Sequence, residues 1–222
     1  MLVEKSVARL VLVNLLTIVA VSAAPIAWGD EVVVGPFSKG TIKDWDEKSF
    51  RGHTEYVIVE DGGRSVLAAK SNSAASGLFK KIDIDLEATP VLNWSWKIDH
   101  VLAAADERSK KGDDYPARVY VVFSSGPLFW KTRTLNYVWS SNQAADAQWP
   151  NAYTGSAHMI AVEGGREQVG QWRTYHRNVR EDFMKYFGED MTQVNAVAIM
   201  TDTDNTDQSA SAWYGDIFFT SK

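Results

Sequence analysis

The sequence predicts an all-β fold, an antiparallel two-sheet β-sandwich with one short helix. Short stretches in which apolar and polar residues alternate recur along the chain between turn-forming residues, which is the pattern of strands with one buried face. A single segment, 179–187, has a helical repeat instead. About ten such strands with one helix favour a sandwich of the jelly-roll type.

The N-terminal 29 residues differ in character from the rest. Lys5 and Arg9 precede an apolar run that is followed by small residues, which is the layout of a secretory signal. The apolar run is shorter than the roughly 20 residues that a membrane span needs. We therefore expect a signal peptide over 1–29 that is cleaved after Ala23 or after Gly29, two sites between which the sequence does not choose.

The remaining chain, residues 30–222, is expected to be one periplasmic or secreted domain with no membrane span after cleavage. The full chain has 222 residues, 45% of them hydrophobic, which is enough for one ordinary core. It contains no cysteine, so no disulfide stabilises it outside the cytoplasm. The formal net charge of -5 argues against nucleic acid as a partner.

The first predicted strands form a hairpin. Segments 56–59 and 65–69 flank Asp61-Gly62-Gly63, whose glycines accept the positive φ of a tight turn. Further strands are expected at 77–84, 91–98, 118–124, 135–140, 158–162, 170–176, 196–201 and 212–219. Glu163-Gly164-Gly165-Arg166 resembles a second hairpin turn, and would pair the strands on either side of it.

The helix over 179–187 has start and stop signals. Asn178 precedes it as a cap with Glu181 three residues later, and Gly188 ends it. Its apolar residues fall on one stripe, so we expect it to lie across the sandwich as a packing element.

Alternation assigns the faces of the strands. In 91–98, Leu92, Trp94, Trp96 and Ile98 share one face, which we expect in the core. If 91–98 and 118–124 are neighbours, Ser95, Lys97, Arg118 and Tyr120 form one polar sheet face suited to a hydroxyl-rich ligand; the alternative is a solvated outer face. The candidate ligand-binding residues are Lys97, Arg118, Tyr120, Asn136 and Trp139.

Residues 126–155 are rich in aromatic side chains. Phe129, Trp130, Trp149 and Tyr153 stand among polar residues in what should be long loops. Aromatic rings with polar surroundings suit stacking on sugars or on another protein, although some must pack against the ends of the sandwich.

The clearest acidic cluster, 201–207, follows an apolar strand. Its alternate oxygens suggest a calcium site made by Asp202 and Asp204 together with Asp216. The spacing is not that of an EF-hand, and an Asx-rich turn is the alternative interpretation.

Catalytic motifs are scarce. The four histidines are isolated, and no nucleophile elbow, phosphate-binding loop or dinucleotide fingerprint is present. The remaining catalytic hypothesis uses Asp113, Asp202 or Asp204 as acid and base, with Arg118 stabilising negative charge.

Several segments together resemble one bacterial family, domain of unknown function 3047. They are RVYVVF at 118–123, NYVW at 136–139, RNV at 177–179, AIMTDTDNT at 198–206 and YGDI at 214–217. The resemblance implies a bacterial, periplasmic protein and no particular activity. The general layout also looks like jelly-roll carbohydrate-binding modules, whose final strand often has an aspartate near a structural calcium, a position that corresponds to Asp216.

Three functions remain open. The favoured hypothesis is a non-catalytic module that binds a glycan or another hydroxyl-rich ligand, because the sequence offers contact surfaces and no recognisable reaction centre. The alternatives are an envelope polysaccharide hydrolase or lyase that uses aspartate carboxylates, and an assembly protein that docks on a component of the cell envelope.

Overall fold

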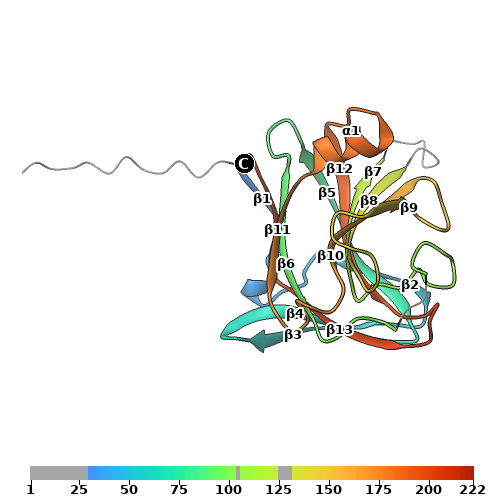
Figure 1. The fold of residues 1–222 in the computed structure, drawn as a ribbon. Helices are drawn as coiled ribbons and strands as arrows, with labels where there is room; N and C mark the ends of the chain where they lie inside the picture. The colour runs from blue at the N-terminus through green and yellow to red at the C-terminus, as the bar shows by residue number, and fades with distance from the viewer. Residues whose placement is uncertain (1–29, 104–105, 125–131) are drawn as a thin grey trace, which may run out of the picture.

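The computed structural model describes residues 30–103, 106–124 and 132–222. In these ranges the chain forms two β-sheets packed face to face, and helix α1 (Val179–Phe187) lies at one end between them (Figure 1). The predicted β-sandwich with one short α-helix is therefore confirmed. The predicted signal peptide lies outside the described residues. None of the helices in the described ranges has the length and apolar character needed to cross a membrane.

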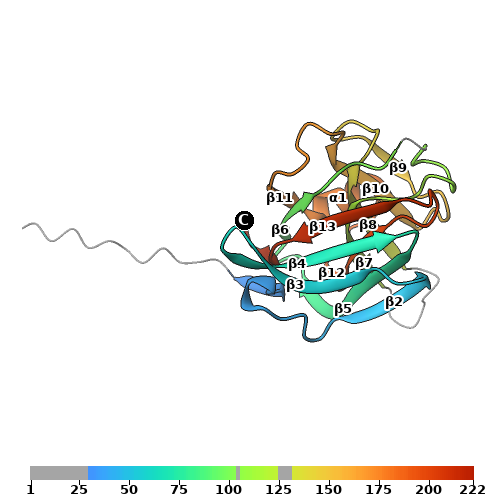
Figure 2. The same cartoon turned by 90° about the horizontal axis from the view of Figure 1, so that it is seen from below.

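Sheet A is built around β6 (Val91–Ile98). Its other strands are β1 (Glu31–Gly35), β3 (Glu55–Asp61), β4 (Arg64–Asn72), β11 (Arg173–Asn178), β13 (Ser209–Tyr214) and β14 (Ile217–Thr220). The order is β1-β14-β6-β13-β4-β3. β13 and β14 share one edge of β6, and β11 pairs with the opposite edge. The 3-10 turn η1 (Phe37–Lys39) follows β1. Figure 2 shows β3, β4 and β13 side by side, as their pairing requires.

Sheet B faces sheet A across the core. Its order is β2 (Asp46–Arg51), β5 (Ala75–Asp85), β12 (Gln193–Asp202), β7 (Ala117–Phe123), β8 (Arg133–Ser140), β10 (Ala157–Gly164) and β9 (Gln148–Pro150). The strand pairs are antiparallel as predicted except at one place, where β10 runs parallel to β8. The chain reverses through the short edge strand β9, which is antiparallel to β10, and so returns in the direction of β8.

One of the two predicted hairpins is confirmed. β3 and β4 pair up to Asp61 and Arg64, and the turn residues Gly62 and Gly63 have φ values of 61° and 80°. The other is wrong, because β10 belongs to sheet B whereas β11 pairs with β6 in sheet A. The turn chemistry at 163–166 therefore starts a connection between sheets instead of a hairpin.

The core lies where the alternation predicts it. Leu92, Trp94, Trp96 and Ile98 are at most 1% exposed. The rings of Trp94 and Trp96 meet edge to face at a centroid distance of 5.6 Å. The hypothesis of one joint polar face required β6 and β7 to be neighbours, but they belong to different sheets. Their polar residues consequently lie on opposite outer faces, with Ser95 and Lys97 on sheet A and Arg118 and Tyr120 on sheet B.

Helix α1 has the predicted bounds. The Asn178 side chain accepts a hydrogen bond from the backbone N–H of Glu181 at 3.2 Å, and Gly188 ends the helix with a φ of 69°. The ring of Phe183 packs on Phe123 of β7 at 4.2 Å. The helix thus follows β11 of sheet A, contacts sheet B and closes one end of the sandwich.

Candidate ligand-binding site

A change of strand partner opens a hollow on the outer face of sheet A. The stretch predicted as one strand at 212–219 is two strands, since β13 pairs with β4 whereas β14 pairs with β1. Between them Gly215 donates a backbone hydrogen bond to the carbonyl of Ser95 at 2.9 Å. A Cβ atom at Gly215 would lie only 2.3 Å from the Ser95 hydroxyl oxygen, so this close approach requires glycine.

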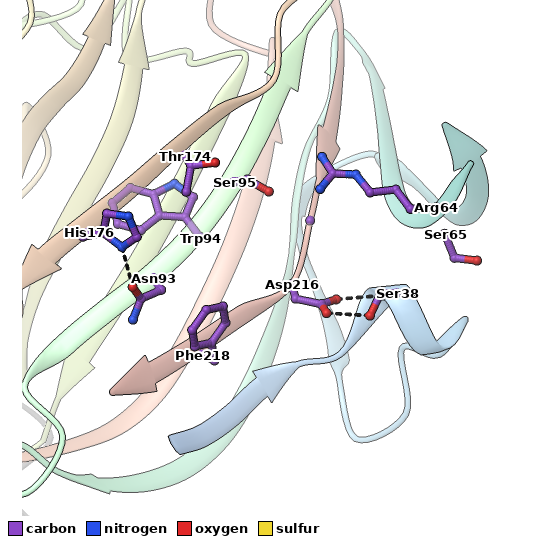
Figure 3. A pocket seen from close by; sticks show the side chains of 11 residues that line it. Ser38, Arg64, Ser65, Asn93, Trp94, Ser95, Thr174, His176, Asp216 and Phe218 are labelled. Atoms are coloured by element: carbon purple, nitrogen blue, oxygen red, sulfur yellow. Dashed lines mark hydrogen bonds between the residues drawn. The ribbon is translucent and has the colours of Figure 1, made fainter. Parts of the chain in front are cut away.

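The hollow has a volume of about 250 Å³ and is lined mainly by polar side chains (Figure 3). Ser95 comes from β6, Thr174 and His176 from β11, and Arg64 from the start of β4. Phe218 of β14 supplies an apolar wall. Small-molecule sites commonly measure roughly 300–1,000 Å³, so this hollow has room for one sugar-sized unit of a larger ligand.

The orientation of His176 is fixed by Asn93 beneath it. The Asn93 amide nitrogen donates to the Val91 carbonyl at 2.9 Å and to the Thr220 hydroxyl at 3.0 Å, which leaves its oxygen facing His176. Nδ1 of His176 lies 2.5 Å from that oxygen and must donate to it. In a neutral imidazole, Nε2 is therefore a hydrogen-bond acceptor.

Other groups of the hollow have hydrogen-bonding capacity to spare. Among the described residues, no hydrogen bond is made by the hydroxyls of Ser95 and Thr174 or by the guanidinium of Arg64, and Arg64 has no ion pair. The Asp216 carboxylate, by contrast, accepts hydrogen bonds from the backbone and hydroxyl of Ser38, at 2.7 and 2.5 Å. The hollow thus offers donors, an acceptor and hydroxyls, the combination that complements ligand hydroxyl groups.

Next to the hollow lies a group of stacked cations and rings. The Arg64 guanidinium lies 3.9 Å from the ring centre of Trp172, and the Lys97 ammonium lies 4.6 Å from that of Trp213. Asp61 binds Lys97 at 2.7 Å and the indole N–H of Trp172 at 2.6 Å. These hydrogen bonds from Lys97 and Trp172 lower the pKa of Asp61 and keep it ionised.

A second polar group lies on the outer face of sheet B, around Arg118. Arg118 binds the Asp202 carboxylate at 2.9 Å, the Asp113 carbonyl at 3.2 Å and the Tyr120 hydroxyl at 2.7 Å. The loop before β7 positions Asp113 and Asp114, and the end of β12 positions Asp202. The side chains of Arg118 and Asp202 are each 5% exposed, so the ion pair is buried.

Burial dominates the electrostatics of this cluster. It raises the pKa of Asp202, with Arg118 opposing the rise and the charges of Asp114 and Asp113 adding to it. Burial also raises the pKa of Asp113. For Arg118 burial acts downward, but the charge interactions with Asp202, Tyr120, Asp113 and Tyr115 together raise its pKa.

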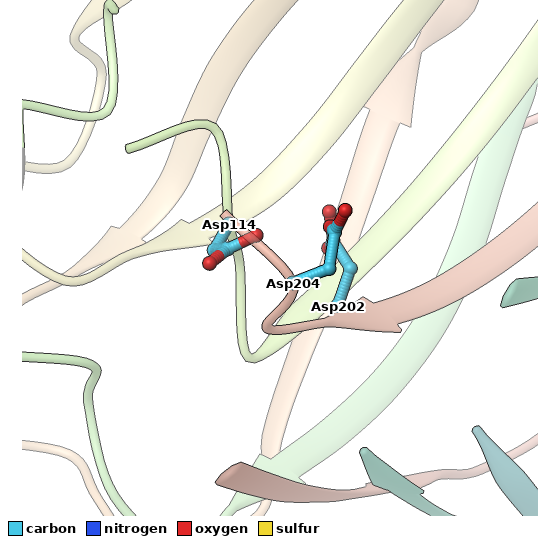
Figure 4. A group of neighbouring side chains, drawn as sticks. All are labelled: Asp114, Asp202 and Asp204. Atoms are coloured by element: carbon cyan, nitrogen blue, oxygen red, sulfur yellow. The ribbon is translucent and has the colours of Figure 1, made fainter. Parts of the chain in front are cut away.

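Three carboxylates of the cluster approach one another. Asp114, Asp202 and Asp204 each have an oxygen within 4.8 Å of the others (Figure 4). Asp114 is already bound by the backbone N–H groups of Asn205 and Thr206, at 3.1 and 2.7 Å. The nearby cavity that Asp114 lines measures only about 10 Å³, about the room that one water molecule needs. Two carboxylates of the cluster are thus already bound within the protein, Asp202 by Arg118 and Asp114 by backbone N–H groups.

The structure separates other predicted site residues. Asp216 is bonded to Ser38 on sheet A, so it is not a partner of Asp202 and Asp204. Trp139 is wholly buried in the core, where its indole donates to the Gly165 carbonyl at 3.0 Å, and it has no surface for a ligand. Asn136, only 1% exposed, is likewise inaccessible.

The aromatic-rich stretch has mixed outcomes. Outside that stretch, the predicted ligand-binding residue Tyr120 is half-buried and donates its hydroxyl to the Met200 sulfur at 3.2 Å. Trp149 is buried in a small second cluster that covers part of sheet B, whereas Tyr153 is 54% exposed. Phe129 and Trp130 lie outside the described residues.

Sequence reasoning missed most of the hollow. Arg64, Thr174 and His176 lie on strands that the pattern identifies only as strands, with no motif to connect them. Gly215, in the middle of a predicted strand, is the one available signal, because glycine inside a strand often marks a close backbone approach.

Comparisons with known proteins give a family and a fold likeness. A family model described as "Protein of unknown function (DUF3047)" matches residues 43–218. No curated protein matches the chain. A family 11 carbohydrate-binding module of a cellulosomal cellulase from Clostridium thermocellum is 11% identical with a TM-score of 0.47, covering 86% of this chain and 95% of its own. A family 28 module specific for non-crystalline cellulose is 17% identical with a TM-score of 0.46, covering 87% and 97%.

Proposed function

Since the chain belongs to the DUF3047 family, whose function is unknown, we propose that the hollow on sheet A defines its role: a non-catalytic module that binds a glycan or another hydroxyl-rich ligand. The supporting observation is the set of uncommitted polar groups in one hollow. Arg64 only donates, Nε2 of neutral His176 only accepts, and the hydroxyls of Ser95 and Thr174 do both. Sugar hydroxyls, which also donate and accept, satisfy such a set.

Several features favour a sugar over other small solutes. Phe218 offers an apolar wall beside the polar groups, and a sugar ring has apolar C–H faces between its hydroxyls. A simple cation is disfavoured because the positively charged Arg64 guanidinium lines the hollow. The only carboxylate among the lining residues, that of Asp216, is already bound by Ser38.

The binding test uses a panel of hexasaccharides: cellohexaose, xylohexaose, mannohexaose and hexagalacturonate. At least one is expected to bind saturably in isothermal titration calorimetry. Arg64→Ala should weaken it about tenfold or more, because a hydrogen bond from a charged donor contributes about 1.5–3 kcal/mol. Lys81→Ala, which removes an exposed cation from sheet B, is the matched control and should bind like the wild type. A panel without any saturable binding, or equal affinity for Arg64→Ala, would refute the proposal.

We also propose that the protein is exported to the periplasm or beyond, on the basis of the leader in residues 1–29. Expressed with this leader in a bacterium, the protein is expected in the periplasmic fraction or the medium. Its intact mass should correspond to a chain starting at Ala24 or at Asp30, the residues after the two predicted cleavage sites. Recovery of the uncleaved chain from the cytoplasm would contradict this proposal.

A further inference from the structure

A second hollow lies on the same outer face of sheet A. It has a volume of about 150 Å³ and is lined by residues of β3, β4 and β13, among them Val57, Ala68, Lys70 and Trp213. Val57 is 42% exposed, so this wall is uncovered apolar surface. The mixture of an aromatic ring, an apolar wall and a cation resembles the lining of the first hollow.

The strand register links the two hollows by a row of outward side chains. Lys97 of β6 is opposite Trp213 of β13, which is opposite Ala68 of β4, which in turn is opposite Val57 of β3. On the other side of β6, Trp172 immediately precedes Arg173, the partner of Trp96. Adjacent strands lie about 4.8 Å apart, so the row from β6 to β3 spans about 14 Å.

Stacking orders the side chains along this row. We use the name cation–aromatic ladder for Arg64, Trp172, Lys97 and Trp213. Arg64 stacks on Trp172, and Lys97 lies 5.5 Å from the centre of the Trp172 ring and 4.6 Å from that of Trp213. Asp61 bonds to both Lys97 and Trp172, so the middle of the ladder is held in place.

Each end of the ladder contributes to one hollow. Arg64 lines the first hollow, and Trp213 lines the second. The ladder between them presents partly exposed rings and cations that are fixed before any ligand arrives, which reduces the entropy cost of binding. One extended ligand can therefore contact both hollows and the ladder at once.

We propose that the ligand is an extended glycan chain that crosses sheet A from the first hollow over the cation–aromatic ladder into the second hollow, where Trp213 contacts a further sugar unit. This inference rests on the proposed glycan binding and adds a second subsite to it. It assigns Trp213 a role in the affinity for long chains and none in the affinity for short ones.

The test measures affinity against chain length. The sugar that binds in the panel is used as a disaccharide and as a hexasaccharide, by calorimetry. The wild type is expected to bind the hexasaccharide at least tenfold more tightly than the disaccharide. Trp213→Ala should abolish this gain while disaccharide affinity stays unchanged, and Val57→Lys, which places a long side chain over the second hollow, should do the same. Phe50→Ala, which removes a 60% exposed ring from β2 of sheet B, is the control and should keep the gain.

The outcomes separate the two proposals. Equal affinity for both chain lengths, or a gain that survives in Trp213→Ala and Val57→Lys, would overturn the second subsite and leave the binding module intact. Failure of every sugar to bind would overturn both. Circular dichroism of each variant verifies that the fold is retained, and Val57→Lys decides the question if Trp213→Ala does not fold.

Discussion

Replacing Arg118 with methionine is expected to lower the free energy of unfolding at pH 7 by about 3–5 kcal/mol, the usual cost of breaking a buried ion pair by removing one partner. The substitution leaves the Asp202 carboxylate buried, with the Asp113 and Asp114 carboxylates nearby and no cation among them. It also removes the donor to the Tyr120 hydroxyl. Urea denaturation followed by tryptophan fluorescence measures the loss.

Two variants test the cause of this loss. Adding Asp202→Asn to Arg118→Met should restore about 1 kcal/mol or more, because the double variant has no unpaired charge at the pair. Arg51→Met removes an exposed partner of Asp207, whose side chain is 72% exposed, and should cost less than about 1 kcal/mol. A loss of the same size in Arg51→Met, or no recovery in the double variant, would show that the buried pair is not the reason.

The pH dependence of the Arg118→Met deficit has a defined sign. Without Arg118, the folded-state pKa of Asp202 rises further above its unfolded value, because burial is no longer opposed. An acid whose folded pKa is raised contributes stability at low pH that is lost as the pH rises. The deficit is thus expected to be smaller at pH 5 than at pH 8.

Alternation along residues 91–98 was sufficient to predict which side chains of this strand are inside. Trp94 and Trp96 are core residues and Ser95 and Lys97 are not, because the period of two is a local property of the backbone. Which strands become neighbours is not local. Nothing near residues 91–98 specifies that β11 and β13 flank β6, and this is why the predicted joint face of Lys97 with Arg118 is wrong.

The polar sites were also only partly predictable from the sequence, because some of their residues come together only through the fold. The catalytic hypothesis from the sequence placed Arg118 near Asp202, and the two side chains do meet on sheet B. The hollow on sheet A depends on Arg64, Thr174 and Gly215, which are brought together from three distant parts of the chain. No spacing rule joins such residues, so only the folded arrangement reveals them.

Stability is also expected to depend on the protonation of one buried glutamate. Glu107 is 3% exposed and binds Ser140 and Ser141 at the end of β8. Burial raises the pKa of Glu107 from its ordinary value of 4.5 to about 7, although hydrogen bonds from Ser140 and Ser141 oppose the rise. The folded state therefore retains this proton at pH values where the unfolded chain has lost it.

The sign and the size of the Glu107 contribution to stability follow from the coupling between proton binding and folding. The contribution of Glu107 to stability is complete below about pH 4.5 and is lost as the pH rises to about 7, and at about 1.4 kcal/mol for each pKa unit it amounts to about 3 kcal/mol. Glu107→Gln, which does not titrate, should remove this dependence. The difference in unfolding free energy between wild type and Glu107→Gln is expected to change by about 3 kcal/mol between pH 5 and pH 8, in favour of the variant at high pH.

This difference is informative whatever the glutamine itself costs. The Ser140 hydroxyl donates to Glu107 and also accepts from the Gln143 backbone at 2.7 Å, so an amide that donates toward Ser140 disturbs the local hydrogen bonds. The cost of the disturbed hydrogen bonds is the same at every pH. Loss of the titrating carboxyl group instead changes how steeply the free energy of unfolding varies with pH. Glu31→Gln, at an exposed position of β1, controls for the removal of one surface charge. Parallel pH profiles for wild type and Glu107→Gln would mean that Glu107 titrates normally and that solvent reaches its carboxyl group despite its burial.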